Sequence, residues 1–144
     1  MDNPALGNYV DHFPYQDGLL INYWDTSQAN NQTKNHPGMG RLLPIDAHPA
    51  ALYRVDGVIW RNRIQTYDST FTLDRTDGFA VHNLSVSYTI PSLPAVKKFD
   101  DRTLHYDPTN PLGSVIHPNT GTIIEIRSIS ALDGFMQVQV RPAK

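Results

Sequence analysis

The sequence predicts an all-β fold: a single antiparallel β-sandwich or jelly-roll-like domain with long loops. Roughly seven to nine short apolar or alternating segments are separated by turn residues about every ten positions. None of these segments shows the 3.6-residue apolar period of an amphipathic helix. A chain of 144 residues with 40% hydrophobic residues can bury one core, so we expect one domain over residues 1–144.

The first third of the chain joins an apolar strand to a polar loop. Residues 1–17 are rich in Asn, Asp, Pro and Gly, which indicates an irregular lead-in. The apolar run that follows predicts a strand over residues 18–24 that is buried on both faces or nearly so. Residues 25–40 form a loop, because their Asn, Pro and Gly residues favour turns. The apolar segment 42–45 contains a proline and indicates an edge or bulged strand.

The middle of the chain contains two further strand signals. An Asp-Gly pair at positions 56–57 predicts a hairpin between short apolar segments. Apolar residues alternate with Ser and Thr over residues 84–90, as in a half-buried antiparallel strand. A proline-punctuated connection over residues 91–98 follows it, and it is too short to define an interdomain linker.

The chain ends on a predicted hairpin. Its strands are expected at residues 122–129 and 135–140, joined by a four-residue link. Met136, Val138 and Val140 alternate with polar residues, so one face is expected to be buried and the other wet.

Composition excludes several classes of function. The formal net charge of −2 gives no basic surface, so nucleic acid and anionic membranes are not expected partners. The absence of cysteine excludes disulfides, thiolate zinc sites and a cysteine nucleophile. No stretch approaches the roughly 20 apolar residues of a membrane span, and the N-terminus lacks the layout of a signal peptide.

An oxygen-rich group of side chains is a candidate calcium site. Calcium prefers several carboxylate and amide oxygens from a compact loop. The alternative is that these side chains cap turns by bonding their own backbone, and the spacing does not match an EF-hand. The candidate ligands are Asp25, Asn30, Asn31 and Asp46, with Asp100, Asp101 and Asp107 as a second group.

No pattern in the sequence identifies catalytic residues. The chain has six histidines but no HExxH or HxH, and it has no GxSxG. His36 and His48 each precede proline, which fits histidines in turns better than zinc ligands. We therefore predict no catalytic residue in this chain.

The aromatic residues allow a second kind of site. Tyrosines and tryptophans on strands can stack on sugars, although such residues more often belong to the core. Trp60 is the informative case, because the neighbouring Arg61 and Arg63 indicate a strand near the surface.

One stretch resembles a known family. DGLLINYWDTS at residues 17–27, Asn31, and HPGMGRLLPIDAHP at residues 36–49 resemble a segment downstream of the catalytic domain in the immune inhibitor A-like secreted zinc metallopeptidases of bacteria. Weaker similarity continues through residues 63–71 and on to the closing hairpin. This chain has Asn30 and Met39 where family members tend to have acidic residues, which counts against calcium in that loop.

The resemblance implies a non-catalytic β-sandwich accessory domain of a secreted, extracellular zinc metalloendopeptidase. In that family the zinc ligands lie in an HExxH helix of a preceding domain, and this chain has no such motif. The implied partners are the catalytic domain of the parent and a protein substrate. The loop residues expected at that interface are His36, Gly38, His48 and Trp60.

Two alternatives belong to other classes. The chain could be a carbohydrate- or surface-binding module, in which case glycan binding would be lost on Trp60→Ala. It could also be a free-standing hydrolase, in which case the purified chain would cleave protein in a zinc-dependent way.

Overall fold

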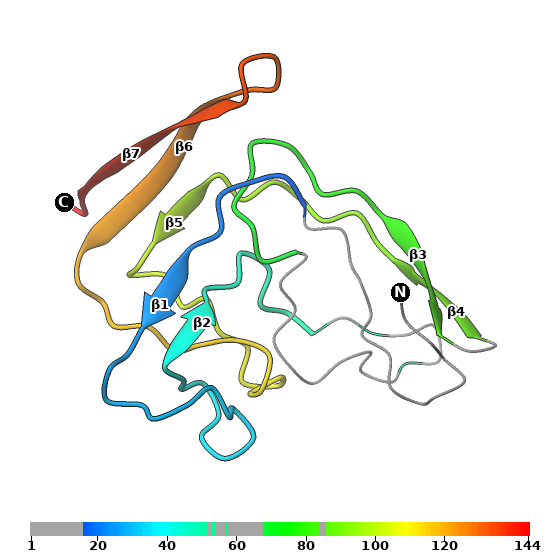
Figure 1. Ribbon diagram of the computed structural model, residues 1–144, viewed down its shortest axis with the longest axis vertical. Coiled ribbons are helices and arrows are strands. Elements are labelled where there is room, and N and C mark those ends of the chain that lie inside the picture. The colour runs from blue at the N-terminus through cyan, green and yellow to red at the C-terminus, as the bar shows by residue number, and fades with distance from the viewer. Residues whose placement is uncertain (1–15, 52, 54–56, 58–67, 84–85) are drawn as a thin grey trace.

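The computed structural model describes residues 16–51, 53, 57, 68–83 and 86–144 (Figure 1). Every regular element in these residues is a β-strand, and all strand pairs are antiparallel, which confirms the predicted all-β class. No helix in the described part of the chain is long and apolar enough to cross a membrane. The prediction of one domain over residues 1–144 stays a prediction.

Within the described residues, the strands form three small sheets. Figure 1 shows β1 and β2 beside the sheet that contains β5, while the β3–β4 hairpin extends away from both. The first sheet pairs β1 (Asn22–Trp24) with β2 (Leu42–Pro44), the second pairs β3 (Phe79–Asn83) with β4 (Val86–Ile90), and the third has the order β5 (Lys98–Asp100), β6 (Thr122–Ser130), β7 (Phe135–Pro142).

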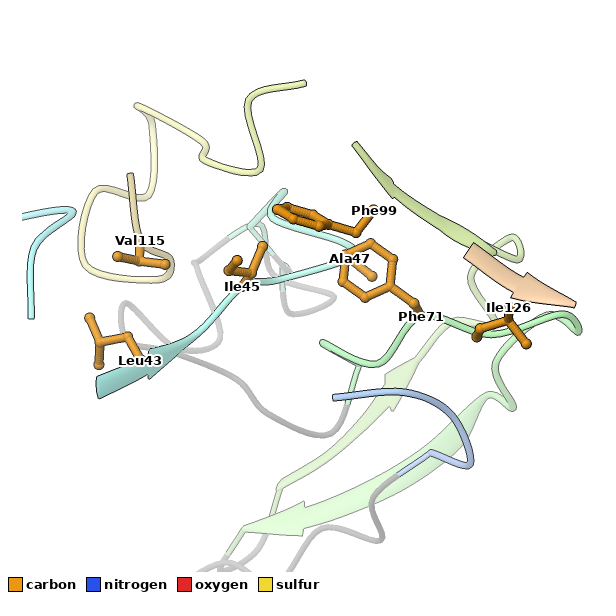
Figure 2. Packing of buried hydrophobic residues seen from close by; sticks show 7 residues of the cluster. All are labelled: Leu43, Ile45, Ala47, Phe71, Phe99, Val115 and Ile126. Carbon is orange, nitrogen blue, oxygen red and sulfur yellow. The ribbon is translucent and has the colours of Figure 1, made fainter. Parts of the chain in front are cut away.

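The core joins segments that are distant in the sequence. Phe71 and Phe99 meet edge to face with ring centroids 5.9 Å apart. Phe71 also forms a backbone bridge with Leu19, with N–O distances of 2.9 and 3.0 Å, which fixes the segment before β1 on the core. Figure 2 shows the buried cluster, whose members are Leu43, Ile45, Ala47, Phe71, Phe99, Val115 and Ile126.

The prediction that residues 18–24 are buried on both faces is wrong. Ile21 and Tyr23 pack against the core, whereas Trp24 is 66% exposed. Because β1 belongs to a two-stranded sheet with one covered face, its side chains alternate between core and solvent. Only the last three residues of the predicted strand are regular β-structure.

The predicted terminal hairpin is confirmed as β6 and β7, with a bulge between Ile126 and Ser128. The prediction that the apolar face of this hairpin is buried is only partly correct. Ile126 is buried opposite Val138, but Val138 is 39% exposed and Val140 is 66% exposed. β7 is an edge strand, and its apolar face extends beyond the core elements that cover β6.

Two other predictions fall at the margins of the described residues. β4 covers Val86–Ile90 of the strand predicted at residues 84–90, and residues 84–85 lie outside the described part. Nearly all of the hairpin predicted around positions 56–57, and residues 1–15 of the lead-in, also lie outside it.

Candidate functional site

The loop between β1 and β2 is held in shape by its own polar side chains. The His36 Nδ1 atom lies 2.8 Å from the Met39 carbonyl oxygen, and its Nε2 atom lies 3.0 Å from Asn30 Oδ1. Asn31 Oδ1 accepts a hydrogen bond from the Leu42 backbone N–H at 2.8 Å. These contacts close the loop against the first residue of β2 without regular secondary structure.

A second set of bonds fixes the loop to residues 111–116. Gly38 N–H donates to the Pro111 carbonyl at 3.1 Å, and Ile116 N–H donates to the Gly38 carbonyl at 2.8 Å. Gly38 has φ of 75°, and a Cβ atom there would lie 2.8 Å from Ile116 Cδ1. Only glycine satisfies both the backbone angle and the close approach. Gly38 is therefore buried within the contact between two loops.

The four candidate calcium ligands do not converge. Asp25 Oδ1 accepts from the Ser27 backbone and hydroxyl groups at 2.9 and 2.6 Å, which lowers the pKa of Asp25. Asp46 follows Leu42 by four residues, about 13 Å along the chain at ~3.3 Å per residue, so it lies at the other end of β2 from Asn31. In the described residues, no group of three or more His, Cys, Asp or Glu side chains could hold a metal ion.

The second acidic group is likewise engaged. Asp100 forms an ion pair with Arg102 at 2.8 Å, and the bonds from Arg102 hold the pKa of Asp100 well below its usual range. Asp101 accepts hydrogen bonds from Thr120 and Gly121, and Asp107 caps the turn at Thr109.

His48 connects three segments at the far end of β2. Its Nδ1 atom lies 2.6 Å from the Asp68 carbonyl oxygen and its Nε2 atom lies 2.8 Å from the Pro94 carbonyl oxygen. The His48 backbone N–H donates to Asp46 Oδ1 at 2.8 Å. Each ring nitrogen of His48 therefore lies against a backbone carbonyl oxygen of a different segment.

Below His48 lies a layer of buried polar groups that the sequence did not reveal. Burial raises the pKa of Asp46 to about 6, against the opposing effect of His48. Burial and the nearby Asp46 charge raise the pKa of Asp68 to about 8. His105 Nδ1 lies 3.1 Å from the Asp46 carbonyl, and desolvation lowers the pKa of His105. The layer joins separate segments of the fold, because Asp46 Oδ1 accepts from the His48 backbone N–H and His105 Nδ1 contacts the Asp46 carbonyl oxygen.

Among the described residues, the exposed aromatic side chains include Trp24, Tyr53 and Phe135, of which Trp24 is the most exposed. Trp60 lies outside the described residues. Trp24 pairs with Leu42 across the β1–β2 sheet, and the two side chains are 66% and 52% exposed. They form an apolar outer face, which we call the β1–β2 face. The sequence did not separate this face from the core, because Asn22 is the one polar residue in the run 19–24.

The described residues line clefts beside the sheets, of which two bear on the site. The smaller, of about 230 Å³, separates β1 from β5 and β6, and is lined mainly by apolar side chains that include Tyr23, Phe99 and Ile124. The larger, of about 380 Å³, is lined mainly by polar residues from 72–77 together with Gln16 and Asp17.

Comparison with known proteins identifies the family. Residues 2–134 match the family described as the immune inhibitor A-like metallopeptidase VEG domain. Immune inhibitor A of Bacillus thuringiensis subsp. alesti is 31% identical over 117 residues, which are 78% of this chain and 17% of that protein. The pre-pro-metalloprotease PrtV of Vibrio cholerae serotype O1 is 40% identical over 60 residues, which are 41% of this chain and 6% of that protein. The chain thus spans a small part of the length of the relatives it matches, and it belongs to the VEG domain family of immune inhibitor A-like metallopeptidases.

Proposed function

We propose that this chain is a non-catalytic accessory domain that stabilises or orients the catalytic domain of a secreted zinc metallopeptidase, or its protein substrate. The observation that carries the proposal is the β1–β2 face. Trp24 and Leu42 expose large apolar side chains on the β1–β2 sheet. The loop that connects the two strands is fixed by hydrogen bonds of Asn31 and Gly38. A rigid scaffold that presents exposed apolar residues is typical of a surface that binds another protein.

The chemistry of the histidines supports a structural role for this chain. His36 and His48 each place both ring nitrogens on partners within the fold. The relatives are described as metalloproteases, and the zinc would be held by the catalytic domain of the parent. The description of PrtV as a pre-pro-metalloprotease fits an exported parent, so we place this domain outside the cell.

The test uses the full-length parent polypeptide and a matched pair of variants. Leu42→Glu places a charge on the β1–β2 face, and Leu132→Glu places the same charge on the β6–β7 link, where Leu132 is fully exposed. Both are expected to change the stability of the isolated chain by less than about 0.5 kcal/mol, since both sites are exposed. In the parent, only Leu42→Glu should lower the unfolding midpoint and the activity on protein substrates. If Leu42→Glu and Leu132→Glu have equal effects on the unfolding midpoint and the activity of the parent, the proposal is contradicted.

Exposure of Trp24 also favours a second candidate, a carbohydrate- or surface-binding module. An exposed indole ring can serve as a stacking platform for a sugar. In that case the isolated chain would bind immobilised glycans, and Trp24→Ala would abolish the binding. Absence of binding across a glycan array would remove this candidate.

A further inference from the structure

One edge of β1 pairs with β2, and no strand of the described residues pairs with the other edge, which we call the free edge. Ile45 N–H donates to the Ile21 carbonyl at 2.8 Å, and Asp25 N–H donates to the Arg41 carbonyl at 2.9 Å. Since ladder bonds alternate along an antiparallel strand, the peptide groups of Asn22 and Trp24 point away from β2. Among the described residues, none forms a hydrogen bond with these two peptide groups at the free edge.

The free edge borders the smaller cleft. Asn22 and Tyr23 line one wall of the 230 Å³ cleft, and Phe99 and Ile124 line another. Figure 1 shows β1 next to β5, the strand that contains Phe99. Pockets for small molecules have volumes of about 300–1,000 Å³, so this cleft has room for a single large side chain in preference to a cofactor.

An apolar strip continues from the cleft onto β7. Ile124 in the cleft lies opposite Val140 in the β6–β7 ladder, and Val140 is 66% exposed. Val138, the next residue on that face, is also exposed. A segment lying along the cleft could therefore bury apolar side chains in addition to the one in the cleft.

We propose that an extended segment from the remainder of the parent polypeptide adds to the free edge of β1 as a strand and places one large apolar side chain in this cleft. This inference rests on the proposed function, because it takes the partner from the same parent. In such strand addition, backbone hydrogen bonds supply affinity and the side-chain pocket supplies specificity. Asn22 and Trp24 provide the backbone groups, and the walls at Tyr23, Phe99 and Ile124 provide the pocket.

The length of the relatives favours a segment of the same polypeptide over a free peptide. This chain spans 17% of Immune inhibitor A, so most of that polypeptide lies outside the matched part. A covalently attached segment has an effective concentration of about millimolar when its linker spans the distance. A free peptide would have to exceed that concentration to compete for the same edge.

The direct test compares amide hydrogen exchange in the full-length parent and in this 144-residue chain. The amides of Asn22 and Trp24 should exchange at least about tenfold more slowly in the parent, because pairing protects an amide from solvent. The Asp25 amide, which already bonds to the Arg41 carbonyl, serves as the internal reference and should change little. Equal exchange of Asn22 and Trp24 in the two proteins would overturn the inference.

Two variants test whether the slower amide exchange arises from pairing at the free edge and from occupation of the cleft. Asn22→Pro removes the N–H at the free edge and no bond to β2, and Asn22→Thr is the control that keeps the N–H. Thr122→Trp fills the cleft from β6 without altering β1. In the parent, Asn22→Pro and Thr122→Trp should restore fast exchange at Trp24, and Asn22→Thr should not. If Asn22→Pro fails to fold, Thr122→Trp decides alone, and protection of Trp24 that survives it would contradict the inference.

The outcomes separate this inference from the proposed function. If Leu42→Glu destabilises the parent but Asn22 and Trp24 exchange freely there, the proposed function stands and the strand addition fails. If Leu42→Glu has no effect, the proposed function fails. The alternative occupant of the edge is a second copy of this chain, and sedimentation of the isolated chain would detect such a dimer. A dimer that already protects the amides of Asn22 and Trp24 would overturn the inference.

Discussion

The two ends of β2 hold polar side chains in opposite settings. At the first end, Asn31 is exposed and bonds to Leu42, 11 residues away. At the last end, Asp46 is buried, and His48 reaches Asp68 and Pro94, which are 20 and 46 residues away. Polar residues at the first end shape a loop, whereas those at the last end join separate segments of the fold. The energetic cost of removing them should differ accordingly.

The largest effect is expected for His48→Ala. This change leaves the part-buried Asp68 carbonyl without its side-chain donor, which costs about 1–3 kcal/mol, and it also removes an exposed bond to the Pro94 carbonyl, whose loss costs less. We expect a loss of about 2 kcal/mol in the free energy of unfolding, measured by urea denaturation. Asn31→Ala removes one exposed bond and should cost about 1 kcal/mol or less. Equal losses would remove the distinction between the two ends of β2.

The second effect is a pH dependence that arises at the buried end. The pKa values of Asp46 and Asp68 are raised in the fold, so these carboxyl groups stabilise it fully below about pH 4. That contribution is lost as the pH rises through about 6 and about 8. The free energy of unfolding should therefore fall as the pH rises from 5 to 8.

Asp46→Asn provides the control for this pH dependence. The amide does not titrate, so the fall between pH 5 and pH 8 should become shallower in the variant. An unchanged slope would place the origin of the pH dependence elsewhere. Stability that rises over this range in the wild-type chain would contradict the burial of both carboxyl groups.

The third effect concerns the exposed end of β2, where Gly38 joins two loops. Gly38→Ala meets both an unfavourable φ and the Ile116 side chain, whereas Gly121→Ala meets only an unfavourable φ of 78° with no atom within 4 Å of the added Cβ. The left-handed conformation costs a non-glycine residue about 1–2 kcal/mol. We expect Gly121→Ala to lose about 1 kcal/mol and Gly38→Ala to lose more. A loss at Gly38 no larger than that at Gly121 would mean that the loop yields to the added methyl group.

The same contrast explains what could be predicted from the sequence. The turn residues of the β1–β2 loop and the alternation in β7 are local patterns, so the loop and the terminal hairpin could be predicted. The exposure of Trp24 was not predicted, because the run 19–24 is apolar except for Asn22, and one polar residue is a weak indication of which face is covered. Family resemblance, carried by residues 17–49, supplied the functional class that periodicity alone lacked.

The candidate site was predictable only where its contacts are local. His36 and Asn30 lie six residues apart, and a turn role for both follows from their neighbours in the sequence. The partners of His48 lie 20 and 46 residues away, so their position depends on the tertiary fold. The burial of Asp68 and His105 was not predicted for the same reason, since neither belongs to a recognisable motif.

The smallest expected effect concerns the candidate calcium site, whose proposed ligands include residues at both ends of β2. Calcium would need oxygens from Asn31 and Asp46 together, yet these side chains lie at opposite ends of the strand and bond to Leu42 and His48. A ligand that binds only the native state raises the unfolding midpoint. Thermal unfolding of the chain with calcium and with chelator should therefore give the same midpoint. A rise in the unfolding midpoint with calcium that is lost in Asp46→Asn would show that the two ends of β2 form one site. It would contradict the contrast between the two ends of the strand.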